Sequence, residues 1–96
     1  MARYELAEHA ARDLEDIYSH SLTKFAERKA DDYLLSLRDC FQRLARMPGL
    51  ARNIDHIRTD YFRFDHASHV IFFVRLPDGI RVMRVLHQRM DIKRHI

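Results

Sequence analysis

The residues best suited to chemistry gather near the C-terminal end of the chain: Arg84, His87, Arg89 and Asp91. Guanidinium and imidazolium groups donate charge-assisted hydrogen bonds to carboxylates and phosphates, so this stretch is suited to an acidic partner. An imidazole with an ordinary pKa of about 6.5 can also transfer protons. A structural interpretation stays open, in which Asp91 pairs with an arginine and the cluster anchors the chain end.

A second group of side chains has the types that bind zinc. His66 and His69 form a close pair, whereas His56 and Cys40 lie further away in the sequence. A structural zinc site needs a full tetrahedral set of ligands, normally as two close pairs, and one pair does not supply it. We therefore expect no metal and no cofactor. We expect His69 to bond to the backbone instead, and Cys40 to be a small buried apolar side chain.

The charge of the chain is unevenly distributed. Residues 1–47 carry 8 basic and 9 acidic side chains, a net charge of −1, whereas residues 48–96 carry 9 and 5, a net charge of +4. The basic residues are 14 arginines and 3 lysines, and arginine is the better residue for bidentate contacts with carboxylate or phosphate. The C-terminal half is therefore expected to meet an acidic surface, of either a protein or a nucleic acid.

Length and composition limit the class of protein. The chain has 96 residues, of which 47% are apolar, which predicts one globular domain spanning residues 1–96. Its single cysteine excludes an internal disulfide and favours a reducing compartment. The sequence contains neither an apolar run long enough for a membrane span nor a signal-peptide core. We expect a cytoplasmic protein without a membrane partner.

The hydrophobic pattern predicts the elements that position these side chains. Residues 3–6 alternate like a strand, and apolar spacing of three and four predicts helices from Glu8 and from about Ala26. Ser19, Ser21 and Thr23 interrupt the pattern between the helices, with Thr23 in a plausible N-cap region. Pro48 and Gly49 end the second helix. The remainder is expected as a loop at 50–58, strands at 61–64, 70–74 and 80–86, a turn at 77–79, and a tail or short helix at 87–96.

The order β-α-α-β-β-β predicts an α+β fold. A short N-terminal strand and an antiparallel helical hairpin would pack with one face of a mostly antiparallel sheet. The other sheet face would be open and partly basic. Alternation directs Phe62 and Phe64 to one face and Tyr61 to the other, and we expect a partner to cover the outer set.

Several stretches of the chain resemble the ParE toxins of the RelE/ParE toxin–antitoxin superfamily. They are residues 11–18 (ARDLEDIY), 30–34 (ADDYL), 44–50 (LARMPGL), 61–64 (YFRF), 69–73 (HVIFF) and 84–91 (RVLHQRMD). The last is the most specific. The sequence departs from the family at Asp60 and Ala26, where glycine is frequent, and at Phe73, where tyrosine is frequent.

The resemblance implies a toxin that poisons DNA gyrase, through its A subunit, and that is neutralised in a hetero-oligomer with a ParD-like antitoxin. It implies no catalytic site and no sequence-specific nucleic-acid binding. It assigns gyrase contacts to Arg84, His87, Arg89 and Asp91. The helical stripe and the aromatic strand are expected to contact the antitoxin through Leu14, Tyr18, Tyr61, Phe62, Arg63, Phe64, Phe73 and Arg75.

A RelE-like ribonuclease is the alternative function. Cleavage of mRNA needs a base, an acid and cations for the phosphate. The arginines at 63, 75, 81 and 84 could serve the phosphate and His87 could transfer protons. The tyrosines all precede the last two strands and only Lys93 is a late lysine, which favours the gyrase hypothesis. A protein that only binds a partner stays open as well.

Overall fold

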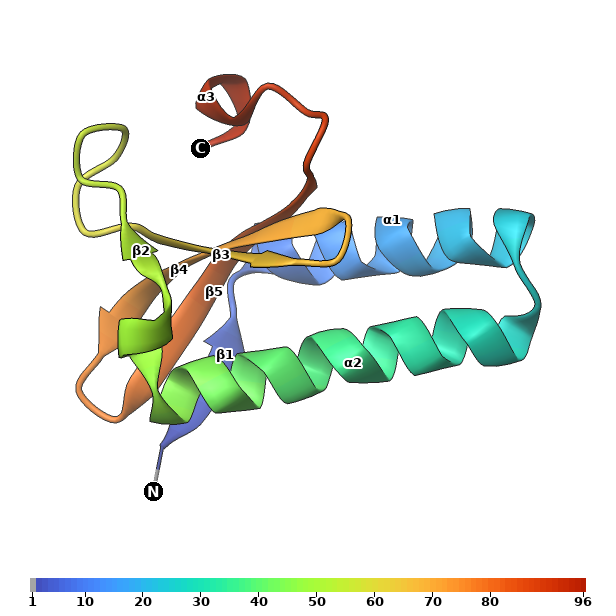
Figure 1. Cartoon of the computed structure of the whole chain (residues 1–96), viewed down its shortest axis with the longest axis horizontal. Coiled ribbons are helices and arrows are strands. Elements are labelled where there is room, and N and C mark those ends of the chain that lie inside the picture. Colours follow the sequence, from blue (N-terminus) through green and yellow to red (C-terminus); the bar gives the residue numbers. More distant parts are fainter. Residues whose placement is uncertain (1) are drawn as a thin grey trace.

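The computed structural model describes residues 2–96, which form one sheet, two long helices and short terminal elements (Figure 1). The elements are β1 (Arg3–Leu6), α1 (Glu8–Lys24), α2 (Glu27–Arg46), a 3-10 turn (Pro48–Leu50), β2 (Arg52–Asn53), β3 (Phe62–His66), β4 (His69–Leu76), β5 (Gly79–His87) and α3 (Ile92–His95). The predicted α+β fold is confirmed. Within the described residues, no helix is both long and apolar enough to cross a bilayer.

The sheet has the strand order β1-β5-β4-β3-β2. All neighbouring strands are antiparallel except β1 and β5, which run parallel. Gly79 opens β5 opposite Arg3, and a Cβ atom there would lie 1.7 Å from the Arg3 carbonyl oxygen. Pairing of the first strand with the last therefore requires glycine at this position.

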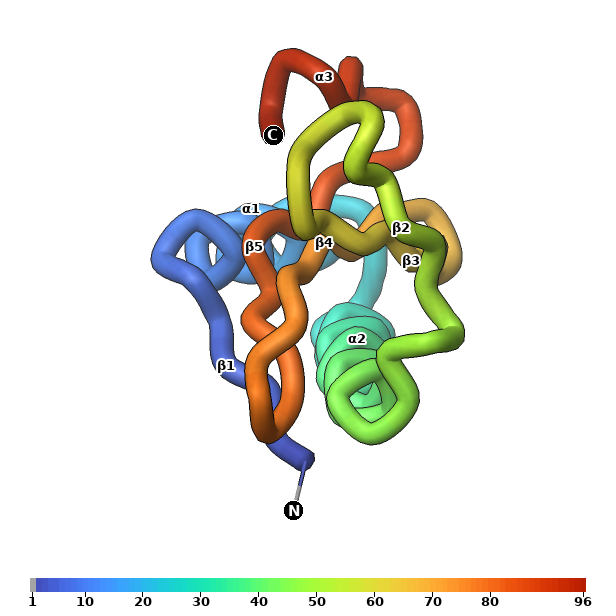
Figure 2. The backbone as a smooth tube through the Cα atoms, turned by 90° about the vertical axis from the view of Figure 1, so that its left-hand side faces the viewer, coloured from blue at the N-terminus to red at the C-terminus, as the bar shows by residue number. Residues whose placement is uncertain are grey.

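The two long helices are antiparallel neighbours that lie along the same side of the sheet (Figures 1 and 2). The interruption predicted at Ser19–Thr23 is wrong, because α1 continues to Lys24. The Ser21 hydroxyl donates to the Ile17 carbonyl and the Thr23 hydroxyl to the His20 carbonyl, so both side chains bond within the helix. The residue before α2 is Ala26, without a side-chain cap, rather than Thr23.

The segment predicted as a loop at 50–58 contains a short edge strand. In β2, Arg52 pairs with Arg63 and Asn53 with Phe62. This pairing was not predictable from hydrophobic alternation because a strand of two exposed residues has no pattern to read. Asp60, which follows it, has φ 65°. Its backbone therefore adopts the left-handed conformation, to which glycine is best suited.

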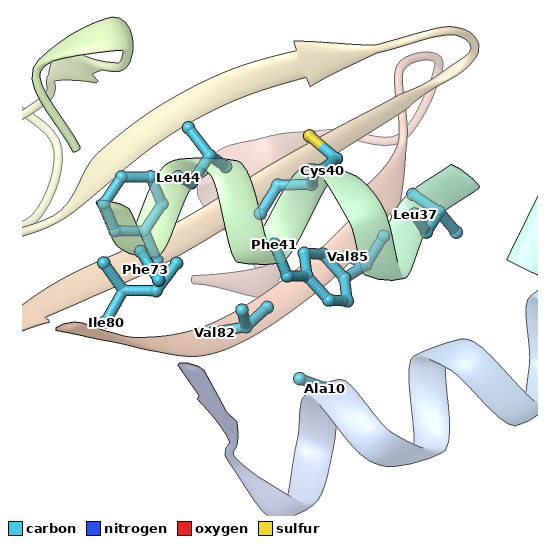
Figure 3. Close-up of a cluster of buried hydrophobic side chains, with 11 residues drawn as sticks. Ala10, Leu37, Cys40, Phe41, Leu44, Phe73, Ile80, Val82 and Val85 are labelled. Atoms are coloured by element: carbon cyan, nitrogen blue, oxygen red, sulfur yellow. The ribbon is translucent and has the colours of Figure 1, made fainter. Parts of the chain in front are cut away.

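The helix-covered face of the sheet contains the larger core, shown in Figure 3. Leu37, Phe41 and Leu44 of α2 pack toward Phe73, Ile80 and Val82 of the sheet, and Ala10 approaches from α1. Cys40 belongs to this core as expected, and burial raises the pKa of its thiol.

The opposite face is closed by the chain itself, so the prediction of an open sheet face is wrong. Its buried residues are Ile54, Tyr61, Val70, Phe72 and Leu86. Ile57 of the loop and Ile92 and Ile96 of the C-terminal segment pack against them. Figures 1 and 2 both show this segment and the loop after β2 at the same end of the molecule. The predicted separation of Phe62 and Phe64 from Tyr61 is confirmed.

A β-bulge in β5, opposite β4, changes the face of the sheet to which the side chains at the end of β5 point. Phe72 pairs with Arg84 but Phe73 pairs with Val82, so Met83 is the extra residue. Val85 therefore faces the helices, whereas Leu86 faces the second core. This shift explains why the alternation in the sequence breaks near the end of β5.

Candidate functional site

Arg84, predicted to contact a target, is held inside the molecule. Its Nε and Nη2 atoms donate to the two carboxylate oxygens of Asp13 on α1, at 2.8 and 3.0 Å. Its Nη1 donates to the His95 carbonyl at 2.8 Å. The two charged side chains are only 18% and 13% exposed, and the hydrogen bonds from Arg84 to Asp13 raise the pKa of the guanidinium. Arg84 therefore joins α1, β5 and the C-terminal segment.

The other three predicted target residues follow in the turn after β5. The Arg89 backbone N–H donates to Nδ1 of His87 at 3.1 Å, which orders the turn. The side chains of Arg89 and Asp91 are exposed. Among the described residues, the Arg89 guanidinium has no salt bridge, and neither does Asp91. The structural alternative, a pair between Asp91 and an arginine, is therefore not observed.

A groove of about 670 Å³ lies between α1, the start of α2 and the end of β5. We name it the histidine groove and define it by Ile17, Phe25, Tyr33, His69, His87 and Met90. Its polar lining includes His20, Lys24 and Lys29. The sequence stretches that contribute to it are far apart in the chain, so the groove depends on the tertiary fold.

The polar floor of the histidine groove is a tyrosine–histidine pair. The Tyr33 hydroxyl lies 2.5 Å from Nδ1 of His69, so the expectation that His69 bonds to the backbone is wrong. Burial, reinforced by the nearby His87, His66 and His20, lowers the pKa of His69 to about 4. Burial raises the pKa of Tyr33. Both side chains are therefore uncharged at neutral pH.

Strand register places three histidines side by side. His66 pairs with His69 across β3 and β4, and His69 pairs with His87 across β4 and β5. The rings of His69 and His87 meet edge to face, with centroids 5.4 Å apart. His66 lies 3.1 Å from the Ser36 hydroxyl of α2, and burial lowers its pKa. Among residues 2–96, no three side chains of the metal-binding types are grouped so as to hold an ion.

The predicted antitoxin contacts are scattered over the structure. Phe73 and Tyr61 are buried in the two different cores, so neither is available to a partner in this conformation. The Tyr18 hydroxyl donates to Asp31 at 2.5 Å and joins the helices. Arg75 is exposed, and the remaining predicted residues, Leu14, Phe62, Arg63 and Phe64, are half-buried.

Sequence reasoning missed Asp13, Lys24, Phe25 and Lys29, and it missed the contact of Tyr33 with His69. Tyr33 falls on the apolar stripe of the second helix, so its position predicts core and conceals the contact with His69. The predicted turn at 77–79 between the last two strands would have brought His69 close to His87, because a short turn fixes the register of a hairpin. No pattern in the sequence indicated that Phe25 lines the groove.

The fold defines the class of protein: a helical hairpin on a five-stranded sheet whose first and last strands are parallel. A solved structure described as "Chromosomal ParDE TA system from P. aeruginosa" is similar to it. The TM-score is 0.75, over 91% of this chain and 96% of that chain, at 16% sequence identity. The likeness shows a shared fold.

The sequence gives the family. The family described as "ParE toxin of type II toxin-antitoxin system, parDE" matches residues 4–92, so the chain belongs to the ParE toxin family. It is similar to Toxin ParE1 of Caulobacter vibrioides, 32% identical over 96 residues that cover 100% of this chain and 99% of that protein. It is also similar to Toxin ParE1 of Mycobacterium tuberculosis, 35% identical over 96 residues that cover 99% and 98% of the two chains.

Proposed function

We propose that this ParE-type toxin arrests bacterial growth by binding DNA gyrase, through its A subunit, and stalling it on cleaved DNA. The family match over nearly the whole chain supports the proposal. The action would take place in the cytoplasm. The toxin would act by contact rather than by chemistry. A ParD-like antitoxin would neutralise it in a hetero-oligomer, in keeping with a structural neighbour described as a ParDE system.

The turn after β5 is the surface that we assign to the target. Arg89 and Asp91 are exposed there, and the turn is fixed at one side by the bond from the Arg89 N–H to His87. Arg84 holds the C-terminal segment through the His95 carbonyl. Arg84 is therefore a positioning residue, whereas Arg89 presents an exposed guanidinium suited to a carboxylate or a phosphate.

Induced expression in a bacterial host tests the proposed function. DNA integrity and mRNA decay are scored in the same cells. Double-strand breaks with intact mRNA are the expected result. Ribosome-dependent mRNA cleavage with intact DNA would overturn the gyrase mechanism, and healthy cells with neither signal would contradict toxicity altogether.

Substitution of Arg89 tests the assigned surface without disturbing the fold. Arg89→Ala should strongly reduce growth arrest and leave the thermal melt unchanged, because the side chain is exposed. Arg94→Ala, also exposed, is the matched control and should remain toxic. Arg84→Ala is unsuitable for this purpose because it removes the contact with Asp13. Full toxicity of Arg89→Ala would exclude Arg89 from the target surface.

The ribonuclease alternative has one structural observation in its favour. The fold brings Tyr33 into contact with His69 and the His69 ring against His87, although all tyrosines precede the last two strands. However, a histidine with a pKa of about 4 is a weak base and is not protonated at neutral pH to act as an acid. His69→Gln and Tyr33→Phe should therefore leave mRNA decay unchanged. A toxin-dependent mRNA cut that these variants abolish would revive the alternative.

A further inference from the structure

A second cavity, of about 340 Å³, lies between the first turn of α1, the loop after β2 and the C-terminal segment. Its volume falls in the lower part of the range that is usual for small-ligand sites. The basic side chains that line it are Arg12, Arg58, Arg84, His9 and His95, and we name it the arginine cavity. Of the described residues, none lines both this cavity and the histidine groove, and Arg89 lines neither.

Arg58 is held in place at the arginine cavity but keeps donors for a ligand. Its Nη1 atom donates to the Ile96 carbonyl at 2.8 Å, and its guanidinium lies 4.8 Å from the centroid of the Tyr61 ring. No salt bridge neutralises Arg58 within the part of the chain that the structure describes. Because a guanidinium carries five N–H groups in a planar fork, Arg58 is both oriented and able to bind a further acceptor.

Arg12 supplies a second guanidinium, which has only a weak internal partner. Its Nη2 atom lies 3.4 Å from Oε1 of Glu8, and the two side chains are 59% and 87% exposed. An exposed pair of this kind contributes little stability, so Glu8 can turn into water when an anion enters. Arg84, by contrast, is bonded to both carboxylate oxygens of Asp13. The charge available to a ligand therefore comes from Arg12 and Arg58.

The Tyr61 side chain adds a hydroxyl group that has no partner in the described chain. Tyr61 is only 6% exposed and lines the arginine cavity. The tyrosine hydroxyls that form hydrogen bonds among residues 2–96 are those of Tyr18 and Tyr33. Every fully buried polar side-chain atom in these residues has a partner, so the Tyr61 hydroxyl opens into the cavity. A largely buried hydroxyl of this kind is satisfied by a ligand or by water.

The arrangement of these donors favours phosphate over carboxylate. Arg12 belongs to α1, Arg58 to the loop after β2, and Tyr61 directly precedes β3, so the donors approach a bound group from different directions. A carboxylate is satisfied in one plane by a single guanidinium, whereas a phosphate presents oxygens in several directions at once. The exposed imidazoles of His9 and His95 add further donors to the lining.

We propose that the arginine cavity binds a phosphate group, with Arg12 and Arg58 supplying the charge and the Tyr61 hydroxyl a directed hydrogen bond. The phosphate belongs either to a free phosphate compound or to the backbone of DNA, because both present the same oxygens. This inference does not rest on the proposed function. It concerns a surface other than the turn that contains Arg89, so either proposal can fail without the other.

Titration calorimetry with inorganic phosphate tests the site on the purified chain. Arg12→Ala should weaken the dissociation constant about tenfold, since it removes a charge-assisted hydrogen bond. Tyr61→Phe should weaken it about threefold, since it removes a neutral one. Without phosphate both variants should melt like the parent chain, because Arg12 is exposed and the Tyr61 hydroxyl has no partner within residues 2–96. Arg28→Ala removes an equally exposed charge from α2, outside the cavity, and is the matched control.

A short fluorescein-labelled DNA duplex is the second probe and identifies the source of the phosphate. Duplex binding that both cavity variants weaken, and that phosphate displaces better than chloride at equal ionic strength, supports the DNA backbone. Phosphate binding that the variants weaken, with duplex binding unchanged, supports a free phosphate compound. The proposal is overturned if neither probe binds, or if the parent chain and both cavity variants bind alike. An equal loss with Arg28→Ala would also overturn it, because overall charge would then account for binding.

Discussion

The two faces of the sheet contain equally buried aromatic side chains but are closed in different ways. Phe73 faces two long helices and Phe72 faces a loop and the C-terminal segment, and both are fully buried. The helices bring whole apolar stripes to the first face. On the second face the C-terminal segment contributes only Ile92 and Ile96 and is held by two arginine contacts to its backbone carbonyls.

The two faces therefore contribute unequally to the stability of the chain. The helix-covered core holds the fold through many interlocking side chains. The C-terminal segment closes its face with few contacts and leaves the preceding turn exposed, with Arg89 in it, which is the surface that we propose for the target. Substitutions in the helix-covered core should therefore lower the free energy of unfolding more than changes to the C-terminal segment.

The helix-covered face should be the more sensitive. Leu37→Ala removes a fully buried side chain and should lower the free energy of unfolding by about 2–5 kcal/mol. Chemical denaturation measures the loss. The matched control is Leu35→Ala, on the same helix but 54% exposed, which should change stability by less than about 0.5 kcal/mol. Similar losses of stability at the two positions would contradict the assignment of Leu37, and not Leu35, to the core.

The Asp13 carboxylate joins α1 to the end of β5, so its loss should have the second largest effect. It accepts hydrogen bonds from Arg84 Nε, Arg84 Nη2 and the Val85 N–H. Asp13→Asn should cost roughly 1.5–3 kcal/mol, the usual range for hydrogen bonds to a largely buried charge. A double-mutant cycle with Arg84→Gln should reveal coupling between the two positions, whereas additive losses would show that the pair acts independently.

Removal of residues 92–96 should be milder than Leu37→Ala. The deletion removes the half-buried Ile92 and Ile96 and exposes part of the second core, for an expected loss of about 1–2 kcal/mol. Unfolding in denaturant, with binding of a hydrophobic dye to the folded state, measures it. A loss as large as that of Leu37→Ala would show that the second face carries as much of the fold as the first.

Stability should also depend on pH through the histidines at the end of the sheet. The folded chain holds His69 with a pKa of about 4, against about 6.5 in the unfolded chain. The unfolded state therefore binds more protons, so the contribution is complete above about pH 6.5 and is lost as the pH falls toward 4. His66 acts in the same direction. His69→Gln should flatten the dependence of the melting temperature on pH over this range, and an unchanged dependence would contradict the assignment.

The hydrophobic pattern of the sequence was sufficient to predict the main helices and strands. It was not sufficient to predict the contacts between them. The apolar stripe through Leu37 and Phe41 predicted α2 and its face, because a long amphipathic helix repeats its signal over several turns. The docking of Ile92 and Ile96 had no such repeat. The packing of the C-terminal segment over the second face therefore could not be predicted from the sequence.

The contacts at the candidate site could not be predicted from the sequence either. The sequence identified Arg84, His87 and Arg89 as a cluster, but the role of Arg84 depends on Asp13, which lies 71 positions away. A single sequence carries no measure of such a pairing. The contact of Tyr33 with His69 joins a helix to a strand, and it depends on how α2 packs against the sheet, which no local pattern specifies.

The central claim is that the chain stalls gyrase through the turn that contains Arg89. The most direct test incubates purified gyrase with supercoiled plasmid and the toxin, and then traps cleaved DNA with a denaturant. The account predicts linear plasmid that increases with the parent chain, is unchanged with Arg94→Ala and falls strongly with Arg89→Ala. No linear plasmid with the parent chain, or an equal amount with Arg89→Ala, would contradict it.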